Sequence, residues 1–377
     1  MKRVVILGGG FAGLFAARML SRRGDVAVTL LDPRAESHFL PMLPDVVGRG
    51  FSREVLTYPL RRAARRWGFT FVNEAAKEID ASTVRSACES LSYDALIVAT
   101  GSTTNYHGQE EIRELSTPLE WFPHALRIRD EATDPSVGTI VIAGAGYTGI
   151  EVATNLRRLA NHRSLTRRIV VVDPAEEICP VVPAKFRPYV AETCERMGIE
   201  VRLETTAQPL DGRTVELSDG ERMDGASLVW SAGVRGVDLA DQLDAEQTRS
   251  KRLVVDETLR VRENVFVVGD AAAVMREGSP LRMGVQFSIS QGALAGENAA
   301  RLLAGRPLEP YRPIDLGYVV PMANFRGCGV ILGLSVRGVI PAMMHYVMCL
   351  YRTFGLEGRA SLLASLLLRG DLDRKNP

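Results

Sequence analysis

The sequence predicts an α/β fold in which two parallel-sheet domains share one plan, the second inserted in the first, with a mainly helical C-terminal segment after them. Two observations support this prediction. A glycine-rich turn occurs twice, each time between an apolar strand and a helix, and apolar strands recur after the second copy. The length of 377 residues is sufficient for two or three domains, each with its own core.

The first glycine-rich turn lies in VVILGGGFAG, residues 4–13, which reads as a buried strand, a turn and the start of a helix. Its G-x-G-x-x-G spacing is formed by Gly8, Gly10 and Gly13. Such glycines allow a tight turn, close approach of the backbone to a pyrophosphate, and close helix–strand packing. The helix begins at Phe11 and Ala12, and its N-terminal amides would face the phosphates. The next strand ends in Asp32, whose carboxylate can accept hydrogen bonds from a ribose diol.

The second turn lies in TIVIAGAGYTGIE, residues 139–151, and repeats the arrangement. Its glycines and the first helical residues are Gly144, Gly146, Tyr147, Thr148 and Gly149. The following strand ends in Asp173, which suits the free 2′-hydroxyl of NADH. A 2′-phosphate would instead need an arginine, and DPAEEI supplies only acids, so NADH is preferred over NADPH. The repeated pattern predicts two Rossmann-like dinucleotide-binding domains.

Three further apolar strands complete the pattern. ALIVATG carries Thr100 and Gly101, SLVWSAGV carries Gly233, and NVFVVGDAAAV carries Gly269 and Asp270. An acid at the carboxyl end of a parallel strand is well placed to meet a ligand. We therefore predict a discontinuous nucleotide domain of residues 1–108 and 256–320, an inserted nucleotide domain of residues 109–255, and a C-terminal segment of residues 321–377.

Composition narrows the range of partners and compartments. The 46 Lys and Arg against 45 Asp and Glu give a formal charge of +1, which argues against nucleic acid as a partner. The five cysteines form no CxxC pair, and an odd count is typical of a reducing compartment. Neither a signal peptide nor a stretch of about 20 apolar residues is present, so we expect a cytoplasmic protein. No metal site is expected.

The motifs together resemble those of a known family. The segments that carry the resemblance are ILGGGFAGL, HFLPMLPDVVGRG, YDALIVATGSTTNY, GAGYTGIE, LVWSAGV and VFVVGDAA. The chain resembles the flavoproteins with two dinucleotide-binding domains of the pyridine nucleotide-disulfide oxidoreductase-like superfamily, without their cysteine pair. Within them it is most similar to the type II NADH dehydrogenases, which are NADH:quinone oxidoreductases of the membrane surface. The resemblance extends along almost the whole chain.

The resemblance implies FAD in the discontinuous domain and NADH in the inserted one. It brings the loop of residues 38–50, with Phe39 and Pro41, to the flavin, and it assigns Asp270 to the ribityl–pyrophosphate region of FAD. It also places Glu151, the last residue of the second motif, beside the isoalloxazine ring. We therefore expect Glu151 to act in catalysis by shaping the electrostatics and relaying protons, a role in which a raised pKa would help.

The segment MGVQFSISQG, residues 283–292, corresponds to the part of the family that borders the quinone. Gln286 keeps the first of two separated glutamines and is expected to contact the flavin and the quinone, while Ser290 replaces the second. Leu316 stands where the family often has a lysine, Tyr147 replaces a proline, and Pro44 replaces a tyrosine. In an alternative interpretation, Gln286 and Gln291 only cap and solvate a helix start.

The C-terminal segment has the pattern of helices that lie in a membrane interface. GVIPAMMHYVMCLY, residues 338–351, has no formal charge, and Leu362, Leu363, Leu366 and Leu367 form one helical stripe. Four arginines flank these apolar faces, namely Arg337, Arg352, Arg359 and Arg369. We expect peripheral docking on the inner face of the membrane; a homodimer interface or packing on the protein's own core are the alternatives. His345 is expected to be packed or interfacial rather than catalytic.

The leading hypothesis is an FAD-dependent NADH oxidoreductase that passes hydride from NADH to flavin N5 and then two electrons to a quinone. The alternative is a soluble reductase with another acceptor, such as a small quinone-like metabolite, a redox protein or oxygen. A third hypothesis is a non-catalytic NADH sensor. Cys179 and Cys328 are the conceivable pair for a sulfide:quinone reductase, although buried, incidental cysteines are the more frequent explanation.

Overall fold

The computed structural model describes residues 1–367 and confirms the α/β fold class. The chain forms two compact units. The first unit contains residues 1–37, 57–103 and 234–315, and the second contains residues 38–56, 104–233 and the described part of 316–377. Each unit carries one of the two glycine-rich turns, whereas the domain boundaries inferred from the sequence stay a prediction.

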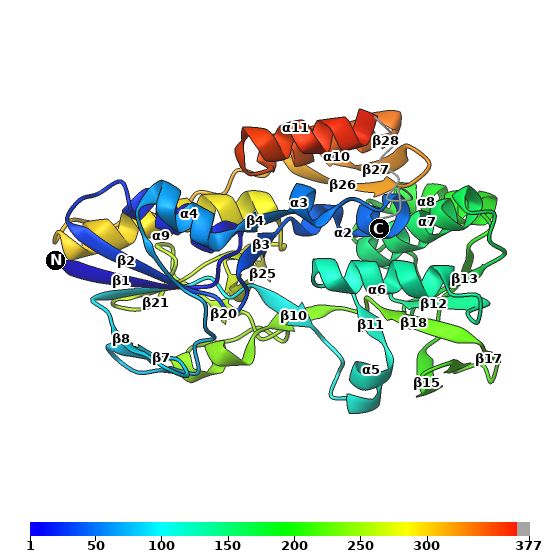
Figure 1. Ribbon diagram of the computed structural model, residues 1–377, viewed down its shortest axis with the longest axis horizontal. Helices are drawn as coiled ribbons and strands as arrows, with labels where there is room; N and C mark the ends of the chain where they lie inside the picture. The colour runs from blue at the N-terminus through cyan, green and yellow to red at the C-terminus, as the bar shows by residue number, and fades with distance from the viewer. Residues whose placement is uncertain (368–377) are drawn as a thin grey trace, which may run out of the picture. The chain divides into compact units, whose positions relative to one another are not determined.

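The first unit is built on a six-stranded sheet with the order β21-β22-β9-β1-β2-β5 (Figure 1). Its strands are β1 (Lys2–Leu7), β2 (Val26–Leu31), β5 (Thr70–Val72), β9 (Ala95–Val98), β21 (Arg260–Arg262) and β22 (Val265–Val267). All neighbours run parallel except β21, which pairs antiparallel with β22. β9 and β22 are buried at every residue, which explains their continuous apolar runs.

Two helices of the first unit, α1 (Phe11–Leu20) and α9 (Val285–Leu303), pack against each other. Small residues allow the close contact, because a Cβ added to Gly292 would lie 2.1 Å from the carbonyl oxygen of Ala12. The other elements of this unit are α4 (Leu60–Trp67), β4 (Thr57–Pro59), β6 (Glu78–Ile79), β7 (Thr83–Arg85), β8 (Ser90–Ser92), β19 (Val234–Gly236), η3 (Asp238–Leu243), β20 (Leu253–Val254), η4 (Gly269–Ala271), β23 (Ala272–Ala273), β24 (Met275–Arg276) and β25 (Ser279–Pro280). β3 (Glu36–His38) and β10 (Ser102–Thr104) lie where the chain passes between the units.

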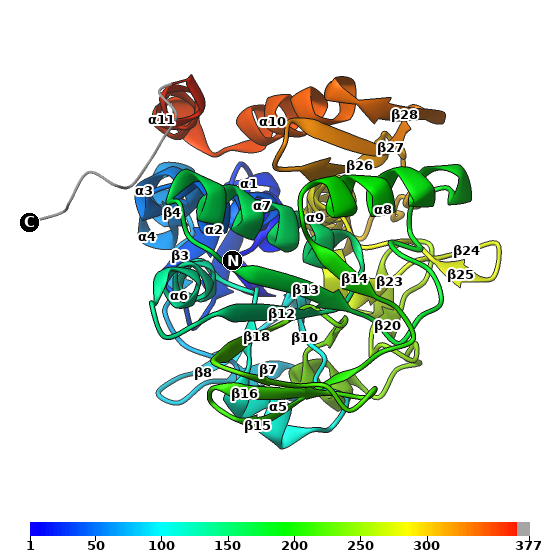
Figure 2. The ribbon, with the colours of Figure 1, turned by 90° about the vertical axis from the view of Figure 1, so that its right-hand side faces the viewer.

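The second unit is built on a five-stranded parallel sheet with the order β11-β18-β12-β13-β14. Its strands are β11 (Thr117–Pro118), β12 (Thr139–Ala143), β13 (Arg168–Val172), β14 (Glu200–Arg202) and β18 (Ala226–Trp230). Figure 2 shows α7 (Tyr147–His162) and α8 (Arg187–Arg196) on one side of this sheet and an antiparallel meander on the other. The meander consists of β15 (Ala207–Asp211), β16 (Thr214–Leu217) and β17 (Arg222–Asp224), and it joins the sheet through a shared apolar core.

The loop of residues 38–50 and neighbouring helices also belong to the second unit. They are η1 (Leu40–Met42), α2 (Leu43–Arg49), α3 (Arg53–Leu56), α5 (Glu110–Leu115), α6 (Phe122–Thr133) and η2 (Ala184–Phe186). α2 packs against α6 and α7 and is buried along its whole length, although it contains Asp45 and Arg49. Buried charges are costly unless they are paired and hydrogen-bonded, so Asp45 and Arg49 require polar partners.

The predicted helical C-terminal segment is confirmed, and a three-stranded antiparallel sheet precedes its helices. The strands are β26 (Gly317–Met322), β27 (Arg326–Ile331) and β28 (Leu334–Gly338), and the helices are α10 (Val339–Arg352) and α11 (Gly355–Leu367). α10 packs against β26 and β27, and α11 packs against α3. Arg369 lies outside the described residues. Within residues 1–367, no helix combines the length and apolar character needed to cross a bilayer.

We predict that Gly292→Ala destabilises the protein, because its methyl group would meet the Ala12 backbone in the contact between α1 and α9. Such overpacking costs about 1–3 kcal/mol. The measurement is urea unfolding followed by circular dichroism. Gly24→Ala is the matched control, since a Cβ there meets no atom within 4 Å; equal midpoints for the two variants would contradict the tight packing.

Candidate active site

The two glycine-rich turns are held by the same hydrogen bonds. In the first unit, the Gly9 amide donates to Asp32 Oδ2 (2.7 Å) and the Arg34 amide donates to Asp32 Oδ1 (2.8 Å). In the second unit, the Ala145 amide donates to Asp173 Oδ2 (2.6 Å) and the Ala175 amide to Asp173 Oδ1 (2.8 Å). Each acid therefore fixes its own strand end against the turn where a dinucleotide would lie.

The outer glycines of both turns are required by the protein itself. Gly8 and Gly144 have φ angles of +106° and +110°, and an added Cβ would lie 2.3 Å from the Ala99 oxygen and 2.6 Å from the Ser231 oxygen, respectively. At Gly13 and Gly149, an added Cβ would lie 1.8 Å from the carbonyl oxygen of the first glycine of the same turn. These positions fix the close packing of helix on strand.

The middle glycines are not required by the protein. Gly10 and Gly146 have φ angles of −76° and −70°, which any residue can adopt, and an added Cβ at either would meet no atom within 4 Å. They are the N-caps of α1 and α7, whose first amides receive no side-chain cap. The open space and the amides fit a pyrophosphate at each helix start, so both turns suit a dinucleotide.

Other residues of the first unit fit a flavin nucleotide. The hydroxyl oxygen of Thr100 is buried and has no hydrogen-bond partner in the described part of the chain. Gly101 and Gly269 have φ angles of +72° and +70° at the carboxyl ends of β9 and β22. Burial raises the pKa of Asp270, against the opposing effects of Arg252 and of hydrogen bonds from Gly284, Ser102 and Ser288. An additional donor from a ligand would stabilise this carboxylate.

The two glutamines of MGVQFSISQG have different surroundings. Gln291 is buried, and its Oε1 accepts a hydrogen bond from the Gly269 amide (2.7 Å), so it holds the turn before Asp270. Gln286, in the first turn of α9, donates to Asp315 Oδ1 (3.2 Å), which also forms an ion pair with Arg282. Gln286 therefore belongs to a polar cluster that the sequence analysis missed, because Asp315 lies 29 positions away along the chain.

Ser290 and the predicted acceptor residues of the second unit differ in their exposure. The exposed Ser290 hydroxyl contacts the Tyr311 hydroxyl at 2.8 Å, a partner the sequence analysis also missed. In the second unit, Leu316 is 44% exposed, Phe39 is buried and Pro41 lies in η1. These roles stay predictions for each unit separately.

Three residues of the second unit flank its open turn. Tyr147 is 48% exposed and Thr148 is partly buried, both in the first turn of α7. Gly233 has a φ angle of +112°, and its carbonyl accepts a hydrogen bond from the Asn105 amide (3.1 Å). Their assignment to NADH contacts also stays a prediction.

Glu151 has the electrostatic property expected of it. It lies on α7 just after the last glycine of the second turn, and its side chain is buried. Burial raises the pKa of Glu151 to about 8; His345 opposes this rise and Asp45 adds to it. At neutral pH the carboxyl group is therefore largely protonated and can donate a proton.

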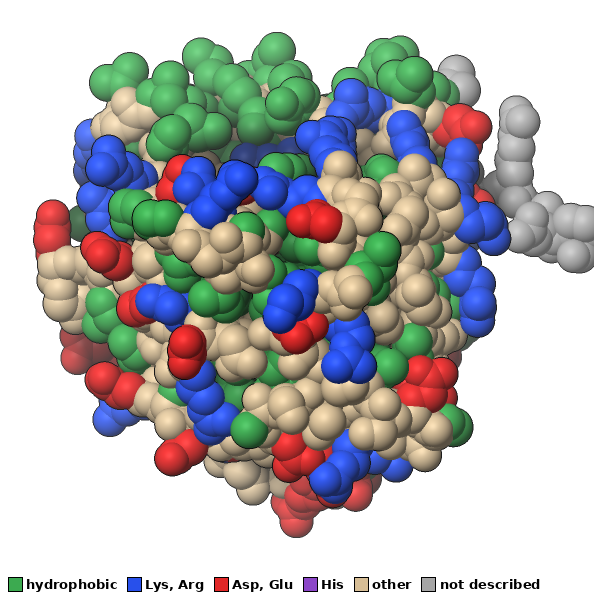
Figure 3. Space-filling view, turned by 90° about the vertical axis from the view of Figure 1, so that its left-hand side faces the viewer, with side chains coloured by type: hydrophobic (Ala, Val, Ile, Leu, Met, Phe, Trp, Pro, Cys, Tyr) green, Lys and Arg blue, Asp and Glu red, His purple; other side chains and the backbone are tan. Residues whose placement is uncertain are grey.

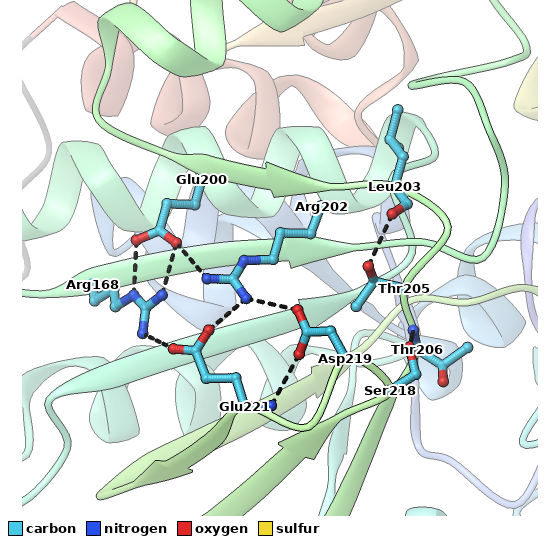
Figure 4. Close-up of polar contacts among 9 residues, drawn as sticks. All are labelled: Arg168, Glu200, Arg202, Leu203, Thr205, Thr206, Ser218, Asp219 and Glu221. Carbon is cyan, nitrogen blue, oxygen red and sulfur yellow. Dashed lines mark hydrogen bonds and ion pairs between the residues drawn. The ribbon is translucent and has the colours of Figure 1, made fainter.

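Arg202 belongs to an ion-pair network of the second unit (Figure 4). The Arg202 carbonyl accepts from the Asp173 amide (3.1 Å), but its guanidinium contacts Asp219 (3.1 Å), Glu221 and Glu200 (3.3 Å). Arg168 pairs with the same two glutamates. Arg202 is thus directed to carboxylates, which agrees with a turn suited to a free 2′-hydroxyl rather than to a phosphate.

The cysteines lack the features of a redox pair. All five are free thiols, and Cys179 and Cys328 are both buried. Burial raises the pKa of Cys179 to about 12 and that of Cys328 to about 11. Because the thiolate is the reactive form, burial disfavours reaction of these side chains at neutral pH.

Two dinucleotide turns of one design, with an acid of raised pKa beside the second, define a two-nucleotide oxidoreductase. The pyridine nucleotide-disulphide oxidoreductase family matches residues 2–292. The type II NADH:quinone oxidoreductase Ndh of Mycobacterium tuberculosis is 30% identical over 96% of this chain and 87% of its own length. The type II NADH:quinone oxidoreductase of Staphylococcus aureus is 25% identical over 95% of this chain and 96% of its own.

Solved structures agree on the fold. NDH2 from Plasmodium falciparum, in complex with NADH, has a TM-score of 0.86 at 14% identity, with 99% of each chain covered. The sulfide:quinone oxidoreductase of Aquifex aeolicus has a TM-score of 0.78 at 17% identity, over 98% of this chain and 96% of that one. This chain belongs to the pyridine nucleotide-disulphide oxidoreductases and, within them, to the type II NADH:quinone oxidoreductases.

We predict that Gly146→Ala weakens NADH binding by about tenfold or more, because its methyl group would fill the space that the pyrophosphate needs. Isothermal titration with NADH measures this, and thermal unfolding without NADH should change little. Gly149→Ala is the contrasting variant: its methyl group would meet the Gly144 carbonyl and should destabilise the unliganded protein. A Gly146→Ala protein with wild-type affinity would refute the assignment of this turn.

We predict that Glu151 makes stability fall as the pH rises from about 4.5 to about 8. In this window the folded protein keeps a proton on Glu151 that the unfolded chain releases, so ionisation favours unfolding. Glu151→Gln should remove this dependence and gain on the order of a few kcal/mol over the wild type at pH 8. Chemical denaturation across this range measures it, and Glu216→Gln on the exposed side of β16 is the control, which should behave as wild type.

Proposed function

We propose that this protein oxidises NADH and passes two electrons through bound FAD to a quinone. The observation that carries the proposal is the pair of open glycine turns, each clamped by its own acid, in a chain of the type II NADH:quinone oxidoreductase family. The balanced reaction is NADH + H⁺ + quinone → NAD⁺ + quinol, so each turnover consumes one proton.

The residues of the first unit would hold FAD. Gly10 and the N-terminal amides of α1 would receive the pyrophosphate, Asp32 the ribose, and Thr100 and Asp270 further polar groups of the nucleotide. Bound flavin supplies the chemistry that side chains lack, because it accepts a hydride and releases electrons to a second substrate. The second unit would hold NADH by Gly146, the amides of α7 and Asp173.

The acceptor side would be formed by residues that orient the quinone. The Gln286 amide can donate to a quinone carbonyl or accept from a quinol hydroxyl, and Ser290 adds a hydroxyl on the same helix. Phe39, Pro41 and Leu316 would provide apolar contacts. Glu151, protonated at neutral pH, would supply the proton that the reaction consumes.

The C-terminal helices would dock on a membrane surface, where the quinone dissolves. Figure 3 shows hydrophobic side chains gathered over these helices. The exposed ones on α10 and α11 are Val339, Ile340, Met343, Val347, Tyr351, Leu356, Leu363 and Leu367. Arg352 and Arg359 belong to the same two helices and would face anionic headgroups. An exposed apolar face of this kind can also bind a second copy of the chain, and flotation with vesicles distinguishes lipid binding from dimer formation.

We predict that a short-chain quinone raises NADH oxidation far above the rate with oxygen alone. Gln286→Ala should lower kcat/KM for quinone by about tenfold or more and leave NADH binding unchanged, because it removes the amide from the acceptor side. The assay follows NADH absorbance and oxygen uptake together. If NADH reduces the flavin but quinone does not raise the rate of NADH oxidation, the acceptor is not a quinone. The replacement of the family's glutamine and lysine by Ser290 and Leu316 would agree with that outcome.

We predict that the protein floats with anionic lipid vesicles in a density gradient. Replacing Leu356 and Leu367, 82% and 73% exposed, by glutamate should lower the vesicle-bound fraction more than tenfold, since a buried leucine contributes about 2 kcal/mol. Leu210→Glu, at a leucine on β15 that is 45% exposed, should float as wild type. If the double variant floats as well as the wild type, this surface does not bind lipid. If light scattering shows that the wild type is a dimer and the double variant a monomer, the surface is a dimer interface instead.

A further inference from the structure

A buried charged cluster joins α2 and α10 within the second unit. The Arg49 Nε group donates to Asp45 Oδ1 (3.0 Å), and the Tyr346 hydroxyl donates to the same oxygen (2.8 Å). His345 Nε2 lies 3.8 Å from Asp45 Oδ2, and Cys349 Sγ lies 3.6 Å from His345 Nε2. The side chains of Asp45, Arg49 and His345 are only 5%, 7% and 10% exposed.

The cluster is attached to the helix that carries Glu151. α2 packs directly on α7, where a Cβ on Gly48 would lie 2.2 Å from Asn155 Oδ1, and Asn155 Nδ2 donates to the Glu151 carbonyl (3.0 Å). On the other side, β26 packs against both α7 and α10, and the Ala323 amide that follows it donates to the Thr154 hydroxyl (3.2 Å). Glu151 and the cluster therefore belong to one buried region.

The charge of this cluster favours the release of a proton from Glu151. Asp45 carries −1, and Arg49 and protonated His345 each carry +1, so the cluster has a net charge of +1. An ionised Glu151 would bring the sum to zero. A proton moved between Glu151 and His345 leaves this sum unchanged, which matters because an uncompensated charge is costly in a buried site.

The electrostatic influences on the two groups agree with this balance. Burial raises the pKa of Glu151, and His345 counteracts the rise. Burial alone would lower the pKa of His345, but Cys349 and the Asp45 carboxylate hold that pKa well above its ordinary value. Burial alone would raise the pKa of Asp45, yet His345, Arg49 and Tyr346 together hold it below its ordinary value. Burial raises the pKa of Cys179, and Cys328 and Glu151 add to the rise.

We propose that His345, oriented by Asp45, is the proton partner of Glu151 and returns the proton that Glu151 gives up. Asp45 and His345 are positioning residues in this scheme, since they act through Glu151. The role rests on the proposed function in one respect: the proton that quinone reduction consumes leaves Glu151, His345 returns one to it, and water reprotonates His345. No electrons move through the cluster.

The first test measures the coupling without turnover. Proton NMR of the purified holoprotein, without NADH or quinone, can follow the imidazole signals, because the chain has only five histidines. His345→Gln assigns the His345 signal. Glu151→Gln should lower the titration midpoint of His345 by about one pH unit, since it removes a negative charge from its surroundings. His38, His107, His124 and His162 are internal controls; a His345 midpoint that moves no more than theirs overturns the proposal.

The second test measures the effect on the reaction. Activity with quinone should fall at high pH as Glu151 loses its proton, and His345→Gln should move this alkaline limb upward by about half a unit or more, because a cation that favours ionisation is gone. Its kcat should also fall at neutral pH while KM for NADH stays unchanged. His162→Gln, on the exposed end of α7, is the matched control.

The two tests separate the possible failures. If the wild type reduces no quinone but Glu151→Gln moves the His345 midpoint, the acceptor assignment fails and the proton pair stands. If quinone reduction is rapid and His345→Gln leaves both the alkaline limb and kcat unchanged, the function stands and the proton pair is rejected. Glu151→Gln is nearly isosteric, so the titration shift is measured in a protein that retains His345, and the His345 variant is needed only to assign the signal.

Discussion

The structure depends on one steric constraint that occurs twice: a helix must approach the strand before it closely enough to exclude a methyl group. Gly13 against the Gly8 carbonyl and Gly149 against the Gly144 carbonyl satisfy it, since an added Cβ at each would lie 1.8 Å from the oxygen. This contact fixes where the first amides of α1 and α7 lie. Asp32 and Asp173 then hold the turns from the neighbouring strands, so phosphate and ribose groups face prearranged partners.

The parts of the fold predicted from the sequence are those whose causes are local. Gly10 and Gly146 are informative because neither backbone geometry nor packing requires glycine there, which agrees with the space that a bound pyrophosphate would need. The acids at the strand ends, Asp32 and Asp173, were predicted from the same strand–turn–helix–strand pattern. The continuous apolar runs of β9 and β22 reflect strands buried on both faces. In each case a short segment contains both the residue and the local feature that determines its structural role.

The unpredicted parts depend on contacts between distant segments. Tyr346 and Asp45 are 301 positions apart, and the sequence around each gives no sign that a hydroxyl from α10 meets a carboxylate from α2. Asp45 lies in a segment similar to the family's flavin loop, so its charge looked incidental beside Phe39 and Pro41. His345 looked like part of an apolar interfacial helix. The sheet of β26, β27 and β28 was also missed, although it supports α10.

The two surfaces of α10 connect these observations. Its outer face presents Met343 and Val347, 61% and 56% exposed, while its inner face places His345 and Tyr346 on the Asp45 carboxylate. A helix that only docked on lipid would need no buried imidazole, and a helix that only packed on a core would bury its methionine and valine. Both faces belong to one helix, so α10 holds the exposed apolar surface and the buried charged cluster together. The proposed proton partner of Glu151 and the proposed membrane-docking surface are therefore parts of the same helix.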